Sequence, residues 1–226
     1  MALTSPQQNV LKGLAVLIMF LDHANRTLWI YQPWVMAIGR LSFPLFAFLI
    51  AYNTTVRGTP LHKYLLPLLV FGAVSQVPAM LALDRGLLPL NIFFTLFLGV
   101  SFLPLGRRVT TRFTIQKPYT WMIWLALGYL WLLLGFAVEY GPAGVFLIPA
   151  VQYFLTRPAL VPAFVTASLL LSANSFSAAS LVPLLLPLIV WGVSCLAPSP
   201  LPRLKWFFYA FYPLHLMILW LLKQAT

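Results

Sequence analysis

The residues best suited to chemistry form one helical turn, Asp22-His23-Ala24-Asn25-Arg26, inside a long apolar run. The chain has only three acidic residues and three histidines, and this turn uses one of each. Ionisable side chains inside a membrane span are costly, so they usually mark a functional site. Histidine titrates near neutral pH and can therefore act as a general base. The turn is accordingly predicted to be the centre of an active site.

Other polar residues are predicted to meet this turn at one depth in the membrane. His23 lies about eight residues before the turn near Tyr31, and Arg40 lies about eight residues after it, which places both roughly 12 Å below the helix ends. Asp22, His23 and Arg40 are therefore the predicted catalytic residues. Four more polar residues fall in the same outer-half layer and are predicted to bind substrate: Gln76, Asn91, Thr95 and His215.

A second relation connects His23 to Lys12. Eleven residues make about three helical turns, so the two side chains share one helix face about 16 Å apart. A long ligand with an anionic end and a reactive end would bridge them. The basic residues at the mouth on the Lys12 side are predicted to hold phosphate groups of this ligand: Lys12, Arg57, Lys63, Arg107 and Arg108.

Each of these residues also has a structural alternative. Asp22 is a candidate for an ion pair that only pins helices together, either with Arg40 or with Arg26, four residues along the same helix. His215 has the alternative of a purely structural role, in which its ring N–H donates a hydrogen bond to a backbone carbonyl. Lys12 and Lys63 have the alternative of being ordinary lysines at the membrane interface. Gln76 and Asn91 have the alternative of only joining helices through their side-chain amides.

The composition predicts an all-α, polytopic integral membrane protein that forms a single domain over residues 1–226. The chain is 62% hydrophobic and 8% charged, whereas soluble domains average about 25% charged residues. Cys195 is the single cysteine, so no intrachain disulfide is possible, and no metal-ligand spacing occurs. Nine apolar segments are predicted, with eight as the alternative and ten as the upper limit: 9–30, 33–55, 63–83, 88–106, 118–136, 142–156, 158–173, 179–197 and 206–222.

The basic residues predict a cytoplasmic N-terminus. Ten of them fall in intervals on the N-terminal side and three, Arg26, Arg85 and Lys223, on the other, which is the asymmetry of the positive-inside rule. The net charge of +11 is therefore assigned to topology and to anionic membrane lipids rather than to nucleic acid. At the start of the first segment, Ser5 is the predicted N-cap, with Pro6 at the first helical position and Gln8 completing a capping box.

Several stretches resemble the TraX family, the pilin acetylases of conjugative plasmids. They cover the first four segments and the last, in family order: Leu11-Lys12-Gly13-Leu14-Ala15, Phe20-Leu21-Asp22-His23, residues 38–49, Ser75-Gln76-Val77-Pro78, residues 90–96 and Phe211-Tyr212-Pro213-Leu214-His215-Leu216. Through the last stretch, Tyr212 joins the predicted substrate-binding residues. The spacing of Lys12 and His23 also resembles that of a wider group of multi-span membrane acyltransferases, which have arginine at the first position.

The resemblance implies acetyl transfer from cytoplasmic acetyl-CoA to the N-terminal amine of a pilin subunit in the bacterial inner membrane, without a metal. His23 is the expected base, and Arg40, His215 or Asn91 the expected donor to the oxyanion. Direct transfer and an acetyl-histidine intermediate stay open at this point. The alternatives are an acyltransferase acting on a glycan or lipid hydroxyl, a small proton-coupled transporter, and a membrane chaperone for pilin.

Overall fold

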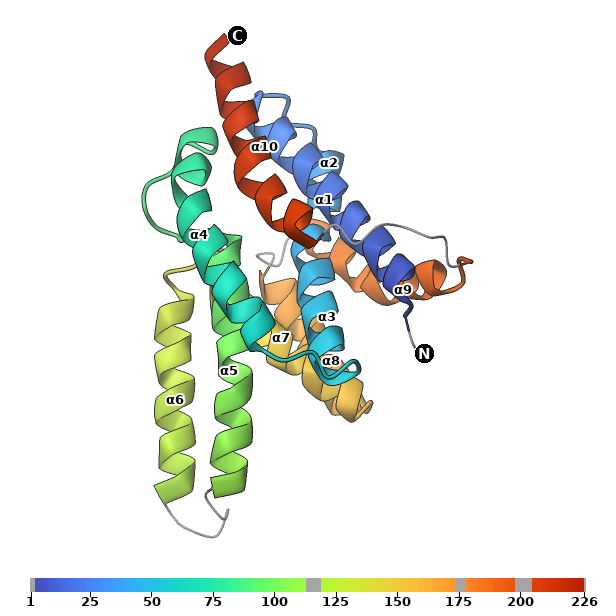
Figure 1. Ribbon diagram of the computed structural model, residues 1–226, viewed down its shortest axis with the longest axis vertical. Coiled ribbons are helices and arrows are strands. Elements are labelled where there is room, and N and C mark those ends of the chain that lie inside the picture. Colours follow the sequence, from blue (N-terminus) through green and yellow to red (C-terminus); the bar gives the residue numbers. More distant parts are fainter. Residues whose placement is uncertain (1–2, 113–118, 174–177, 198–204, 226) are drawn as a thin grey trace.

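A computed structural model describes residues 3–112, 119–173, 178–197 and 205–225 (Figure 1). Over these ranges the chain is helical, and an isolated bridge between Leu90 and Val138 supplies the extended pairing. The elements, in chain order, are α1 (Ser5–Thr27), α2 (Pro33–Gly39), α3 (Ser42–Thr55), α4 (His62–Ala82), α5 (Ile92–Arg112), α6 (Tyr119–Gly135), α7 (Gly141–Thr156), α8 (Leu160–Ala173), the 3-10 helix η1 (Ala178–Leu185), α9 (Leu186–Ser194) and α10 (Lys205–Ala225).

Each predicted apolar segment corresponds to one helix or to two consecutive helices. Helices α2 and α3 share the second segment, with a break at Arg40 and Leu41 that the pattern did not predict, and η1 and α9 share the eighth. Three helical stretches are long and apolar enough to cross a membrane by length and composition: Pro33–Thr55, His62–Ala82 and Trp206–Ala225. Five shorter apolar helices accompany them: Ile92–Leu103, Met122–Gly135, Gly141–Thr156, Leu160–Ala173 and Ala179–Ser194.

Helix α1 is long enough to cross a bilayer but carries much of the polar chemistry. Its 23 residues span about 35 Å. Lys12, Asp22 and Arg26 reduce its hydropathy. Asp22 and His23 lie on its buried face with apolar residues such as Leu11 and Ile18, and Lys12 and Arg26 are half-buried. Polar groups of this helix therefore face the protein interior, as expected where ionisable residues serve a site.

The N-terminus of α1 begins one residue earlier than the sequence pattern indicated. The N-cap is Thr4 rather than Ser5, because Thr4 has an extended backbone and its hydroxyl accepts from the Gln7 backbone N–H. The Gln7 side chain accepts in turn from the Thr4 backbone N–H at 2.9 Å, which completes a capping box. The Gln7 amide also donates to the backbone carbonyls of Ser194 and Leu196, which ties α1 to the end of α9.

Helices α1 and α10 both run from the N-terminal toward the C-terminal end of the bundle (Figure 1). At the N-terminal end, Arg57 after α3 donates to the Ser5 hydroxyl at the start of α1, at 3.2 Å. At the C-terminal end, Lys223 of α10 forms an ion pair with Asp84 after α4 and lies over the Trp29 ring at 4.9 Å. Contacts between distant segments therefore close the bundle at both ends.

Asn91 fixes the start of α5 against α4. Its side-chain oxygen accepts from the Phe93 backbone N–H at 3.0 Å, and its amide donates to the Gly72 carbonyl at 2.7 Å and to the Gln76 side chain at 2.9 Å. Gln76 also accepts from the Asn91 backbone N–H and donates to the Leu87 carbonyl at 2.8 Å. The loop between α4 and α5 is thus held by a saturated amide network, which positions the wall of the site described next.

Replacing Asn91 by alanine should lower the free energy of unfolding by about 2–4 kcal/mol, because it leaves buried backbone groups without partners and removes the cap of α5. Ser101→Ala is the matched control on the same helix, since the Ser101 hydroxyl only donates to the Leu98 carbonyl one turn back. That control should change stability by about 0.5 kcal/mol or less. Denaturant unfolding in detergent micelles measures both, and equal stabilities would contradict the structural role of Asn91.

Candidate active site

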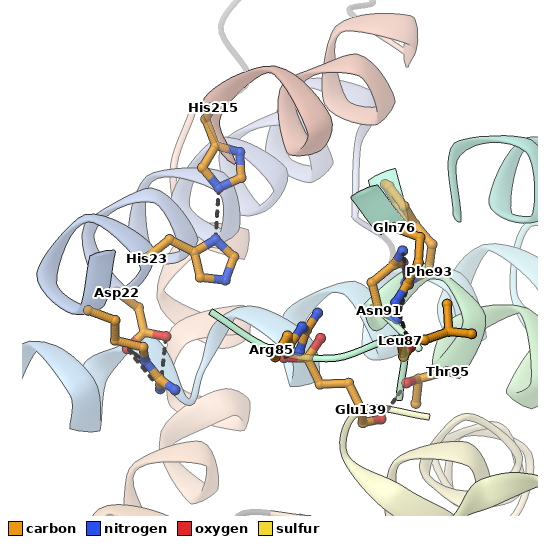
Figure 2. A network of polar contacts seen from close by, with 11 residues as sticks. Asp22, His23, Gln76, Arg85, Leu87, Asn91, Phe93, Thr95, Glu139 and His215 are labelled. Carbon is orange, nitrogen blue, oxygen red and sulfur yellow. Dashed lines mark hydrogen bonds and ion pairs between the residues drawn. The ribbon is translucent and has the colours of Figure 1, made fainter. Parts of the chain in front are cut away.

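His23 of α1 and His215 of α10 form the centre of the site (Figure 2). His23 Nδ1 lies 2.8 Å from His215 Nε2, and the two ring planes differ by 7°. His215 Nδ1 lies 2.8 Å from the Phe211 carbonyl oxygen. Both histidines are buried, and the Phe211 and Tyr212 rings pack against them. The structure therefore joins the first and last helices through two imidazoles that were predicted to share one depth.

These contacts assign the protons of both rings. A carbonyl only accepts, so His215 Nδ1 carries the proton and donates to Phe211. In neutral His215 the Nε2 atom then has a free lone pair, so His23 Nδ1 must be the donor in the bond between the rings. His23 Nε2 is left with a lone pair, and in Figure 2 this nitrogen points away from His215. The hydrogen bond to a backbone carbonyl that was considered as an alternative for His215 is therefore present. Through it, the lone pair of His23 is placed on Nε2, where it could accept a proton.

Asp22 forms its ion pair with Arg26, one turn along α1, at 3.0 Å. Of the two partners considered for Asp22, the structure thus selects Arg26 over Arg40. Arg40 follows α2 directly and is half-buried, and its Nε atom is buried without a hydrogen bond of standard geometry. The Asp22 side chain packs directly against Gly39, where an added Cβ would lie 2.6 Å from its Cγ. Asp22 and Arg40 therefore lie close enough for their charges to interact, without forming an ion pair.

Asn25 completes the polar turn of α1 by holding the following loop. Its side chain accepts from the Gln32 backbone N–H at 2.8 Å and donates to the Gln32 carbonyl at 3.1 Å. Its own carbonyl accepts from the backbone of Ile30 and Tyr31. The hairpin between α1 and α2 is therefore closed at the residue next to the site, which fixes the position of Gly39 against Asp22.

A second ion pair, between Arg85 and Glu139, faces the histidines across the site (Figure 2). The Arg85 guanidinium lies 3.4 Å from the Glu139 carboxylate. The backbone around Glu139 is held by Leu90, which accepts from the Glu139 N–H at 2.8 Å, and by the Thr95 hydroxyl, which donates to the Glu139 carbonyl. Sequence reasoning missed this pair because both residues lie between apolar segments, and only the scarcity of acidic residues marked Glu139.

Three of the predicted substrate-binding residues have their polar atoms engaged elsewhere. Gln76 and Asn91 bond each other and the backbone, and Thr95 bonds the Glu139 carbonyl. None of the three lines either cavity described below, among the residues that the structure places there. These contacts correspond to the alternative in which such side chains join helices. Of the predicted substrate-binding set, Tyr212 and His215 are the residues that reach His23.

A small cavity of about 20 Å³ adjoins His23 and holds about one water-sized group. Both carboxylates of the site face it, and Tyr140, which stacks on Phe43 with ring centroids 4.2 Å apart, forms part of its wall. The lining comprises Met19, Asp22, His23, Gly39, Ser42, Ile92, Glu139, Tyr140 and Tyr212. Acidic groups beside a base with a free lone pair suit a cationic ligand that must lose a proton.

A larger cavity of about 340 Å³ leads from the N-terminal end of the bundle toward the same histidine. Lys12, Arg57 and Lys63 line its mouth, and aromatic residues such as Phe93 and Tyr209 line its interior. This volume is in the range of small-molecule sites. The structure thus brings together three of the five predicted phosphate-binding residues. The side chains of the other two, Arg107 and Arg108, lie outside the described residues.

The two cavities share three wall residues: Met19, Ile92 and Tyr212. They separate a space with a cationic mouth from a space with two carboxylates and the His23 imidazole. Reactants of opposite charge entering from the two sides would therefore meet at this wall. No feature of the sequence alone predicted the wall, because its members come from α1, α5 and α10.

A profile for a family described as "TraX protein" matches residues 7–223. A "Protein TraX" from Escherichia coli is 27% identical over 94% of this chain and 86% of its own length. A "Protein TraX" from Escherichia coli strain K12 is 45% identical over 47 residues, which cover 21% of this chain and 19% of that relative. No solved structure matches the chain.

Gly39→Ala should displace Asp22, because the new Cβ would overlap the Asp22 side chain. We expect a loss of about 1–3 kcal/mol in unfolding free energy, the usual cost of overpacking. Gly13→Ala on α1 is the matched control: a Cβ there meets nothing within 4 Å, and alanine favours the helix. Thermal unfolding of both variants in detergent tests this, and a Gly39→Ala protein as stable as the control would contradict the packing.

Proposed function

The chain belongs to the TraX family, and from this premise we propose that it is a membrane-embedded acetyltransferase. The proposed reaction moves an acetyl group from cytoplasmic acetyl-CoA to the N-terminal amine of conjugative pilin subunits, as the family resemblance implies. The observation that carries the proposal is the cavity that runs from Lys12, Arg57 and Lys63 to the wall beside His23. A polyanionic donor with a long arm suits a cationic mouth and a deep apolar interior.

The proposed topology places this mouth on the cytoplasmic side of the inner membrane. Nine spans with the N-terminus inside put Ser5, Arg57 and Lys63 at the cytoplasmic face, where CoA is found. The ion pairs Asp22–Arg26, Arg85–Glu139 and Asp84–Lys223 then lie toward the outer face. The excess of basic residues in the intervals on the N-terminal side supports this orientation.

In the proposed mechanism, His23 is the general base. The acceptor amine is protonated in water and must lose a proton before it attacks the thioester carbonyl. His23 Nε2 has the free lone pair for this proton, because its other nitrogen donates to His215. Asp22 and Glu139 face the same small cavity and stabilise the ammonium before transfer. His215 is a positioning residue that holds the His23 tautomer through its bond to the Phe211 carbonyl.

His23→Ala should lower acetylation of the pilin N-terminus by at least about 10²-fold, the usual contribution of a general base. His62→Ala is the matched control, because His62 is exposed at the start of α4 and lines neither cavity. Mass spectrometry of pilin from cells that express equal amounts of each variant gives the acetylated fraction. Near-normal acetylation with His23→Ala would refute the role of His23, and unacetylated pilin with the wild-type protein would refute the proposed function.

Replacing Lys12, Arg57 or Lys63 by glutamine should raise the KM for acetyl-CoA by about tenfold each, or ~1.4 kcal/mol per lost charge contact. The effect should shrink at high salt because the contacts are electrostatic. Arg157→Gln is the matched control, since Arg157 is exposed after α7 and does not line the cavity. Steady-state kinetics with purified protein measure the KM. A KM that rises equally in the control would show a general effect of net charge instead of a donor site.

A further inference from the structure

The proposed reaction needs a hydrogen-bond donor at the thioester carbonyl, because the oxygen becomes negatively charged when the amine attacks. The reacting carbon belongs to acetyl-CoA, which enters through the large cavity. The amine must reach this carbon from the small cavity. The carbon therefore lies at the wall that both cavities share. Met19, Ile92 and Tyr212 form this wall, and of their side chains the Tyr212 phenol alone can donate a hydrogen bond.

The surroundings of Tyr212 leave its hydroxyl available. Tyr212 is 2% exposed, and its hydroxyl is buried without a hydrogen-bond partner of standard geometry. Such groups are rare in proteins and call for an explanation. The ring is held in place by Phe93, with centroids 5.1 Å apart, and by His23, with centroids 5.9 Å apart. The hydroxyl is therefore fixed beside the base, with the Arg85 side chain close to it.

The donors expected from the sequence are either engaged in other hydrogen bonds or lie outside the shared wall. Both nitrogens of His215 are engaged with His23 and the Phe211 carbonyl. The Asn91 amide donates to the Gly72 carbonyl and to Gln76. Arg40 lines neither cavity among the residues placed there. Ile92, beside Tyr212 in the shared wall, is the first residue of α5, so the positive end of this helix also favours negative charge at the wall.

We propose that the Tyr212 hydroxyl is the oxyanion donor of the acetyl transfer, an assignment that rests on the proposed function. The ammonium first releases one proton through His23 Nε2 to water, so that the amine is neutral. The amine nitrogen then forms a bond to the thioester carbon while its second proton passes to His23 Nε2. The carbonyl oxygen gains negative charge and accepts a hydrogen bond from the Tyr212 hydroxyl. The carbon–sulfur bond then breaks, the carbonyl re-forms, and the CoA thiolate takes the proton from His23. The products are the acetylated amine and free CoA, and the tyrosine keeps its own proton throughout.

Tyr212→Phe tests this assignment because it removes the hydroxyl and keeps the ring. We expect kcat for an amine-terminated pilin peptide to fall by about 10²- to 10³-fold, with an unchanged KM for acetyl-CoA. Tyr153→Phe is the matched control, since Tyr153 is half exposed on α7 and lines neither cavity. S-ethyl-CoA, a thioether without the carbonyl, should bind wild-type and Tyr212→Phe proteins equally.

The outcomes separate this assignment from the proposed function. Wild-type protein without acetyl transfer would overturn the proposed function itself. Active wild-type protein together with a Tyr212→Phe kcat within twofold of it would overturn the Tyr212 assignment alone. A fall in S-ethyl-CoA affinity equal to the fall in kcat would show that Tyr212 shapes the donor site instead, and would also overturn the assignment. Unfolding curves identical to wild type confirm that the variant is folded.

Discussion

The hydrogen bond between His23 and His215 is the interaction on which the rest of the site depends. It joins residues 192 positions apart and thereby fixes α10 against α1. It also determines which His23 nitrogen keeps a lone pair, because His215 is held by the Phe211 carbonyl. A base inside an apolar protein is useful only if its proton is placed on the correct nitrogen. Packing between the first and last helices and the proposed chemistry are therefore set by one contact.

The distribution of charge gives the molecule two different ends. All three acidic residues of the chain form ion pairs toward the C-terminal end, with Arg26, Arg85 and Lys223. The large cavity opens at the N-terminal end with basic residues at its mouth. Burying a charge is costly unless it is paired, and two of these paired residues, Asp22 and Glu139, also line the small cavity. This polarity suits an anionic donor on one side and a cationic acceptor on the other.

The sequence predicted the helical segments and much of the site because both follow local rules. Apolar runs marked the segments, and counting residues from the helix ends brought His23, Arg40 and His215 to one depth. The pairing of Arg85 with Glu139 could not be predicted, because both lie in loops whose approach depends on tertiary packing. The break at Arg40 likewise depends on how α2 packs against α1, whereas the pair of Asp22 with Arg26 lies within one helix and was among the partners that the sequence indicated. The cavities and the wall at Tyr212 arise from three helices that no periodicity connects.

The central claim is that an acetyl group passes from the Lys12 side of the protein to an amine on the opposite side, through His23. The most direct measurement uses purified protein in vesicles in which the orientation of the N-terminus is known. Labelled acetyl-CoA is supplied only on the side of the Lys12 mouth, and an amine-terminated pilin peptide only on the other. We expect labelled peptide to accumulate only with this arrangement. Equal labelling when donor and peptide exchange sides, or an unlabelled peptide in both arrangements, would contradict it.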